Sequence, residues 1–205
     1  MSPKRSPAQD TLRGLRRGQI VAAARALVAA EGLEGLTIGA LEARLGYSRG
    51  VITYHFRDKE EIVAQVLRSA VEEIDAATAA EVSASATPGE KVRAVLRANV
   101  RGFLDRREAG LILLSFWGRL SSDARARKVN AQLYAGYRER TAQLLAAGRA
   151  AGAFAKDVDP QALAALIVGI VLGIASQAYF EPGSIDVDAA VEEGSRCVLA
   201  RLGRR

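Results

Sequence analysis

Cysteine is almost absent from this chain, since Cys197 is the only one. No disulfide can form within the chain, which is typical of proteins that work in the reducing cytoplasm. The first 17 residues are polar and basic, without the apolar run of a secretory signal peptide. We therefore expect a cytoplasmic protein that folds without disulfides.

Aromatic residues and proline are also scarce, at 5% of the 205 residues and five prolines. β-Rich proteins depend on aromatic and β-branched residues, whereas this chain is rich in alanine, the best helix former. Hydrophobic residues make up 49% of the chain, enough for a core in one or two small domains. The composition therefore predicts an all-α protein.

His55 is the only histidine, so it has no second histidine for a metal site or for a histidine-based triad. The sequence also shows no metal-ligand spacing, no Gly-rich phosphate loop, no nucleophile elbow and no paired carboxylates placed for catalysis. We expect a protein that is not an enzyme and that needs no metal and no cofactor.

Acidic residues are in deficit, and the deficit is concentrated near the N-terminus. Residues 1–60 contain ten Lys or Arg against six Asp or Glu, whereas residues 61–205 contain nineteen against seventeen. A basic segment attached to a nearly neutral remainder indicates a module that faces phosphates, although a solvated basic surface gives the same count.

Residues 37–59 contain the most informative pattern of the chain. Ile38, Leu41 and Leu45 form one apolar stripe on a short helix. Gly46 follows as a stop signal because it can adopt a positive φ, and the Ser48 hydroxyl is placed to cap the next helix. Two short helices joined by such a turn are typical of the helix-turn-helix that reads a DNA major groove.

The second short helix, residues 49–55, has an apolar face and a polar face. We predict that Arg49, Gly50 and Thr53 face base edges. Arg can bond bidentately to guanine, Thr offers a hydroxyl and a methyl, and Gly admits a close backbone approach. The residues predicted to contact phosphates are Thr37, Ser48, Tyr54, His55 and Lys59. For Tyr54 and His55 the alternative is a packed ring.

The same segment carries a resemblance to a known family. At their fixed spacing, the motifs that resemble the signature of TetR-type transcriptional regulators are Ser48-Arg49-Gly50, Val51-Ile52, His55-Phe56, Lys59-Glu60-Glu61 and Ile62. The resemblance covers residues 15–65, and Thr53 is similar to the variant of the choline-type subgroup. Residues 114–134 resemble the ligand-domain helices of that subgroup. The resemblance implies a nine-helix fold with a three-helix DNA-binding head and a C-terminal body that binds an effector and dimerises.

Taken with the family resemblance, the cap and stop signals divide the chain into three parts: a disordered arm at 1–10, a helix-turn-helix DNA-binding domain at 11–57, and what the resemblance implies is a ligand-binding and dimerisation domain at 58–205. The nine expected helices lie near 11–30, 38–45, 49–55, 59–82, 88–106, 108–118, 121–151, 160–180 and 187–202. At the start of the first helix, Arg13, Arg16 and Arg17 either touch the DNA backbone or minor groove or stay solvated.

Residues 162–180 carry no charge and are just long enough to cross a bilayer. Asp159 and Glu181 bracket this run, and no Lys or Arg cluster flanks it, so a buried helix in a soluble dimer is favoured over a membrane span. Small residues then let two helices approach closely. The residues predicted at the dimer interface are Gly169, Gly173, Ser176, Val191 and Val198.

More than half of the aromatic residues fall on helices that, in the fold implied by the resemblance, would surround a cavity in the body where the family binds its effector. The predicted ligand-binding residues are Phe103, Phe116, Trp117, Tyr134 and Tyr137, and Phe180 belongs to the same set. Aromatic faces suit flat ligands and cations, although each ring taken singly is equally well explained as core. The subgroup resemblance and the single Trp indicate a quaternary ammonium effector.

These observations predict a homodimeric, ligand-responsive transcriptional regulator, a repressor that binds a palindromic double-stranded DNA operator and is released by a small-molecule effector. Two alternatives stay open at this point. One is a helical dimeric ligand-binding module, or an enzyme, without specific DNA binding. The other is a membrane-anchored helical protein that uses residues 162–180.

Overall fold

The computed structural model describes residues 7–117 and 124–203. Within these residues the chain forms helices and no strand, which confirms the all-α prediction. The described residues form nine helices: α1 (Pro7–Gly35), α2 (Ile38–Leu45), α3 (Arg49–His55), α4 (Lys59–Ala84), α5 (Pro88–Asp105), α6 (Arg107–Trp117), α7 (Ala124–Ala150), α8 (Pro160–Phe180) and α9 (Val187–Gly203).

Helix α1 is longer than predicted at both ends. It begins at Pro7, so residues 7–10 of the predicted disordered arm are helical, and the rest of that arm lies outside the described residues. Gly32 has a φ of 71°, a value that favours glycine, and it breaks the helix where the sequence placed its end. A further turn follows the break and leads into α2.

The turn between α2 and α3 is set by local capping. The Thr37 Oγ1 accepts a hydrogen bond from the backbone N–H of Ala40 at 3.0 Å, which satisfies one donor at the start of α2. Gly46 ends α2 in the left-handed conformation, with a φ of 66°. Ser48 stands at the N-cap of α3 but its side chain makes no capping bond, so the predicted capping role of Ser48 is wrong.

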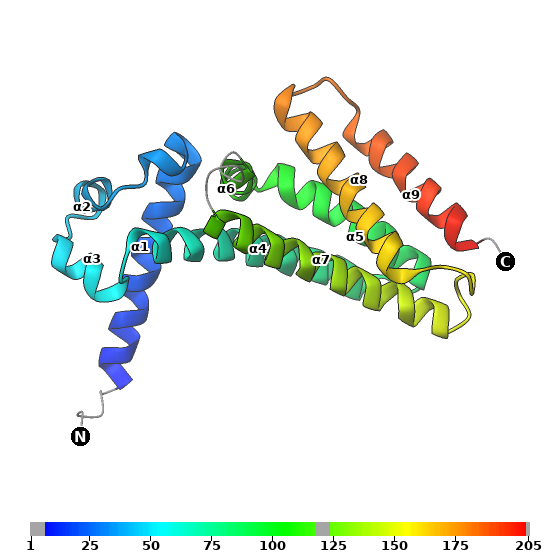
Figure 1. Ribbon diagram of the computed structural model, residues 1–205, viewed down its shortest axis with the longest axis horizontal. Coiled ribbons are helices and arrows are strands. Elements are labelled where there is room, and N and C mark those ends of the chain that lie inside the picture. Colours follow the sequence, from blue (N-terminus) through cyan, green and yellow to red (C-terminus); the bar gives the residue numbers. More distant parts are fainter. Residues whose placement is uncertain (1–6, 118–123, 204–205) are drawn as a thin grey trace.

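The first three helices form a head at one end of the molecule, and α4 runs from this head into the body (Figure 1). The apolar stripes predicted from the sequence meet inside the head, where the residues with almost no exposure are Ile20, Leu36, Leu41, Ile52, Phe56 and Ile62. Because Ile62 already belongs to α4, the head core continues into the helix that leads to the body.

In the body α5 is central, because it packs against α4, α7, α8 and α9, and α7 packs along α8 (Figure 1). Helix α6 packs against α1, α4 and α5, so it joins the head to the body. The body core is centred on Leu96, Leu145, Ile167 and Val198, which come from four different helices.

Helix α8 is the one helix in the described parts of the chain that is long and apolar enough to cross a membrane by length and composition. One face of α8 packs against α5, α7 and α9, where Leu163, Ile167 and Ile174 are buried. The opposite face is open: Leu166 is 56% exposed and Phe180 is 76% exposed. An exposed apolar face of this kind is typical of a surface that binds a partner.

Candidate DNA-binding surface and effector cavity

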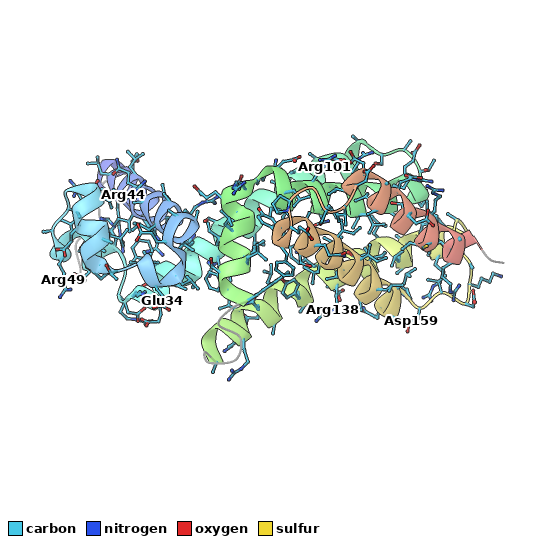
Figure 2. All side chains as sticks on the ribbon, turned by 90° about the horizontal axis from the view of Figure 1, so that it is seen from above. Glu34, Arg44, Arg49, Arg101, Arg138 and Asp159 are labelled. Carbon is cyan, nitrogen blue, oxygen red and sulfur yellow. The ribbon has the colours of Figure 1, made fainter. Side chains whose placement is uncertain are left out.

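The polar face of α3 is exposed, as the sequence predicted. Arg49, Gly50, Thr53 and Tyr54 are all exposed, and Arg49 lies at the outer edge of the head, away from the body (Figure 2). The Thr53 hydroxyl donates a hydrogen bond to the Arg49 carbonyl at 3.0 Å. Since its hydrogen is engaged within the helix, Thr53 can meet a base through its methyl group or through a lone pair on its oxygen.

The residues predicted to contact phosphates differ in accessibility. Thr37 and Ser48 are exposed, Lys59 is half-buried at the start of α4, and Tyr54 is 59% exposed. The Arg13 guanidinium lies 5.7 Å from the centroid of the Tyr54 ring, so α1 places a cation beside the exposed face of α3. These contacts to phosphate stay predictions.

The structure does not support His55 as a phosphate contact. Its side chain is only 5% exposed, and the ring packs edge-on against Tyr54 at a centroid distance of 5.1 Å. Burial lowers the pKa of His55, and the nearby cations Arg13, Arg16 and Arg17 lower it further. A neutral, buried ring matches the packed alternative that the sequence left open.

Arg17 has a structural role in the head. Its Nη1 donates to the His55 carbonyl at 2.6 Å, and its Nη2 pairs with Glu61 at 3.1 Å. Its guanidinium also lies 4.1 Å from the centroid of the Phe56 ring. The Arg57 backbone N–H and, secondly, Arg17 hold the pKa of Glu61 below its usual value. Arg17 therefore ties α1 to the end of α3 and the start of α4.

The body encloses a cavity of about 40 Å³ between α4, α5, α6, α7 and α8. Three predicted ligand residues, Phe103, Tyr134 and Tyr137, are among its lining residues, together with Asn99 and Thr141. The cavity holds no more than a few water molecules. An effector larger than that must enlarge the cavity or extend beyond it.

The other predicted ligand residues lie elsewhere. Phe116 is 1% exposed and packs in the core shared by the head and α6, so it is core and does not line the cavity. Phe180 is on the outer surface of α8, so its predicted place beside the cavity is wrong. Trp117 is a neighbour of the lining, because its Nε1 donates to the Tyr134 hydroxyl at 2.6 Å.

Both cavity phenols are neutral at physiological pH, and burial makes their ionisation still less favourable. Burial raises the pKa of Tyr134 to about 12 and also raises that of Tyr137. Neutral phenols present aromatic faces and hydroxyl dipoles to a ligand without a competing negative charge.

A second space of about 350 Å³ adjoins the cavity and shares four lining residues with it: Val95, Asn99, Tyr137 and Thr141. Asp75 and Arg140 also line this outer space, and the Arg140 Nη2 contacts both Asp75 oxygens at 2.9 and 2.8 Å. Burial raises the pKa of Asp75, and the neighbouring Arg140 opposes that shift.

Sequence reasoning missed Asp75 and Arg140. The signal for Asp75 was present, since it interrupts a stripe at helical spacing formed by Val71, Thr78 and Val82. A carboxylate on such a stripe is a candidate for a buried polar contact. The partner, Arg140, lies 65 residues away, and nothing local in the sequence connects the two positions.

The predicted interface residues fall into two groups. Gly169 is exposed on α8, and Gly173 and Ser176 are half-buried on the same helix. Val191 is 7% exposed and Val198 is 1% exposed, because both turn inward from α9 into the core of their own chain. A second chain cannot reach these two valines, so their assignment to the interface is wrong.

Arg25 connects the head to the body. From α1 it contacts Glu108 of α6 at 2.6 Å and Glu73 of α4 at 2.7 Å, and it also donates to the Ser69 hydroxyl at 3.3 Å. Its side chain is 15% exposed, so these interactions are partly shielded from water. One side chain thereby links the three helices through which the head and body meet.

Two family models match this chain. Residues 20–66 match the model of bacterial regulatory proteins of the tetR family, and residues 88–203 match the model of the C-terminal part of BetI-type transcriptional repressors. The chain belongs to the TetR family of transcriptional regulators. The TetR-type match runs from within α1 through α2 and α3 to the first turns of α4, and the BetI-type match covers α5–α9, including the apolar helix α8.

Individual relatives agree with this assignment. The HTH-type transcriptional regulator BetI of Burkholderia thailandensis is 28% identical over 189 residues, which cover 88% of this TetR-family chain and 90% of the relative. A crystal structure of a transcriptional regulator from Saccharomonospora viridis in complex with choline has a TM-score of 0.78 at 22% identity, covering 94% of this chain and 100% of that one. A TetR transcriptional regulator from Chloroflexus aurantiacus has a TM-score of 0.80 at 22% identity, covering 94% of this chain and 98% of that one.

The family assignment confirms the class of function predicted from the sequence. The protein is a ligand-responsive transcriptional regulator with a helix-turn-helix head, its BetI-type body is that of a repressor, and it is not an enzyme. The solved structures, at 22% identity, show the shared fold and do not carry the ligand over to this chain.

Proposed function

We propose that this protein represses transcription in the cytoplasm by binding a palindromic operator as a homodimer, and that a small organic cation such as choline releases it. The observation that carries the proposal is the combination of an exposed recognition helix with a separate tyrosine-lined cavity and an adjoining space that one carboxylate, Asp75, lines.

The exposed residues of α3 support operator reading. Arg49 and Thr53 are accessible at adjacent turns, and the first 60 residues hold a surplus of positive charge for the phosphate backbone. A helix-turn-helix dimer places its two recognition helices about 34–36 Å apart, one turn of the DNA, so the operator is expected to be palindromic.

The open face of α8 supports a homodimer. A Cβ built at Gly169 or Gly173 meets nothing within 4 Å in the chain itself, so no packing inside the chain calls for glycine there. Glycine in the middle of a helix costs about 1 kcal/mol relative to alanine. Close approach of a second α8 explains both glycines and also covers Leu166, which is 56% exposed.

The chemistry of the cavity supports a cationic effector. The rings of Tyr134 and Tyr137 and the carboxylate of Asp75 are groups that attract an ammonium ion. Choline, the ligand of the similar Saccharomonospora viridis structure, is small and carries a permanent positive charge. Its charge suits Asp75 and the tyrosine rings, and its size requires it to enlarge the inner cavity or to extend into the adjoining outer space.

Specific DNA binding tests the regulatory part of the proposal. The purified protein is titrated into labelled DNA from the region flanking its own gene, with a shuffled duplex as control and several salt concentrations. We expect tight binding to a palindrome within the flanking DNA and binding to the shuffled duplex that is weaker by about 1,000-fold or more. Equal binding to both duplexes at every salt concentration would contradict operator recognition.

A further inference from the structure

Arg140 occupies the place that a cationic ligand would take at the polar end of the cavity. Its guanidinium lies 5.2 Å from the centroid of the Tyr137 ring, and its Nη2 contacts the two Asp75 oxygens at 2.9 and 2.8 Å. Proteins bind an ammonium ion with aromatic faces and with carboxylates, and here both groups contact the same cation. Here the chain supplies the cation itself.

Arg140 also lines the space that adjoins the inner cavity. The inner cavity has only about 40 Å³, whereas the outer space that Arg140 and Asp75 line has about 350 Å³. The two spaces meet at Tyr137, Asn99 and Thr141. A ligand that extends from the tyrosine rings into the outer space therefore comes to lie in a space lined by the Arg140–Asp75 pair.

The Arg140 side chain can move away from the ion pair more easily than the Asp75 side chain can. The Arg140 side chain is 55% exposed, so a change of rotamer returns its guanidinium to water, whereas the Asp75 side chain is only 30% exposed. Burial raises the pKa of Asp75 even with Arg140 beside it, because its carboxylate is poorly solvated. If Arg140 leaves, another cation at Asp75 restores the lost interaction, and a neutral ligand does not.

We propose that Arg140 is a built-in competitor of the effector. In the free protein Arg140 contacts Asp75 and the face of the Tyr137 ring, and an organic cation displaces it on binding. Asp75 thereby selects for positive charge, and Arg140 sets the concentration at which the effector binds. This inference rests on the proposed function in assuming a cationic effector. It adds which residue recognises the charge and which residue opposes binding.

The expected size of the effect follows from the strength of the pair. Ion pairs exposed to this degree favour the closed arrangement over the open one by a factor of up to about five. The apparent affinity of a ligand is reduced by the fraction of molecules in the open arrangement. Removing the Arg140 charge is therefore expected to tighten choline binding by about two- to fivefold.

Calorimetry and the fluorescence of Trp117, the only Trp of the chain, report binding of choline to the full-length protein. Arg140→Gln should lower the Kd for choline by about two- to fivefold, and Arg140→Lys, which keeps the cation, should stay close to the wild type. Asp75→Asn should raise the Kd by about tenfold or more. In the Asp75→Asn background, Arg140→Gln should no longer tighten binding.

Two controls separate this effect from a general change in charge or fold. Arg97→Gln removes another exposed arginine that pairs with an acidic residue of α4, Glu81, and it should leave the Kd for choline unchanged. The neutral analogue 3,3-dimethylbutan-1-ol has the shape of choline with carbon in place of nitrogen. Because it carries no charge for the carboxylate to attract, its affinity should respond to Asp75→Asn much less than that of choline.

The outcomes distinguish the inference from the proposed function. If the wild type binds choline and Arg140→Gln binds it equally or more weakly, Arg140 is no competitor and the inference is wrong, while the cationic effector stands. If neither the wild type nor Arg140→Gln binds choline, both the effector class and the inference are wrong, and specific DNA binding by the same preparations shows whether the regulatory function remains.

Discussion

Arg49 shows how a single side chain connects the sequence to DNA reading. It is the first residue of α3, it is exposed, and it extends from the outer edge of the head (Figure 2). A guanidinium in this position can form two parallel hydrogen bonds with the O6 and N7 of a guanine in the major groove. An arginine that only contacts phosphate would add affinity without discrimination between sequences.

Replacing Arg49 by Ala is expected to weaken binding to the operator by about 1–3 kcal/mol and to relax the preference at one base pair. Titrations of wild type and variant against single-base operator variants measure this change. Lys156→Ala is the matched control, because Lys156 is exposed on the body and its loss removes one positive charge far from the head. An equal loss of affinity on every DNA sequence would reassign Arg49 to a phosphate.

His55 makes the stability of the head depend on pH. Its pKa in the folded chain is lowered below the ordinary value of 6.5, by burial first and then by Arg13, Arg16 and Arg17. Above pH 6.5 the ring is neutral in both the folded and unfolded states. Below pH 6.5 the unfolded state takes up a proton first, so stability is lost as the pH falls from 6.5 to the lowered folded-state pKa.

Urea unfolding at pH 7.5 and pH 5.8, at one protein concentration, measures this loss. Because His55 is the only histidine, the wild type should be less stable at pH 5.8, and His55→Gln should lose most of this difference. A variant that keeps the full difference would show that another group is responsible.

Residue-scale predictions succeeded where exposure follows from position on a helix. Arg49 and Thr53 are exposed as the polar face of 49–55 indicated. His55 is buried because α1 packs across the end of α3, where Arg17 holds its carbonyl at 2.6 Å. That contact joins residues 38 positions apart, so no local pattern could have revealed it.

At the scale of the elements, helix boundaries were the most predictable feature because caps are local. Asp58 accepts from the Glu61 backbone N–H at 2.8 Å, and Thr87 forms a reciprocal capping box with Glu90. Both devices can be read from four adjacent residues. Packing between helices is not encoded locally in this way. The apolar residues of α9 were recognised from the sequence, but the direction in which Val191 and Val198 face depends on the positions of α5 and α8.

Gly110 is an example of packing that the sequence did not predict. A Cβ at this position would overlap the Tyr179 hydroxyl of α8 and the Phe103 carbonyl of α5. The Tyr179 hydroxyl donates to that same carbonyl at 3.0 Å, so the junction of α5 and α6 is held closely against the end of α8. Glycine is required at this position because of the close contact, since the φ of Gly110 is not positive.

Gly110→Ala is therefore expected to destabilise the protein by about 1–3 kcal/mol, which is typical of overpacking. Gly18→Ala is the matched control, because a Cβ at Gly18 of α1 meets nothing within 4 Å. This control should stabilise the protein by about 0.5–1 kcal/mol, since alanine is the better helix former. Chemical denaturation of both variants measures the two effects, and equal stability of the two would contradict the packing described at Gly110.

At the scale of the whole molecule, the proposed operator binding requires two chains. One chain leaves an apolar face of α8 uncovered and presents one recognition helix, whereas a palindrome requires two. Gly169, Gly173 and Ser176 are predicted to contact a second chain, and this contact stays a prediction. The absence of any neighbour near a Cβ at either glycine is the support that the structure adds.

Gly169→Leu and Gly173→Leu are expected to disrupt the dimer, because a leucine would separate two closely packed copies of α8. Sedimentation velocity over a range of concentrations measures the change. Ala147→Leu places the same side chain at an exposed position of α7 and should leave the dimer intact. A dimer of unchanged affinity in both glycine variants would remove α8 from the interface.

The connections between head and body offer a physical route for effector control. The cavity lies against α4 and α6, and Arg25 links these two helices to α1 of the head. An effector that fits only one arrangement of the body shifts the population of head positions. A complete change, from 1:99 to 99:1, requires it to favour one arrangement by about 5.5 kcal/mol.

The measurement that tests this account most directly is the affinity of the protein for its operator with and without saturating choline. The account predicts that choline raises the Kd for operator by about tenfold or more, and that operator raises the Kd for choline by the same factor, because coupling between two sites is reciprocal. An unchanged operator Kd, with choline shown to be bound by the fluorescence of Trp117, would contradict the claim that the cavity controls DNA binding.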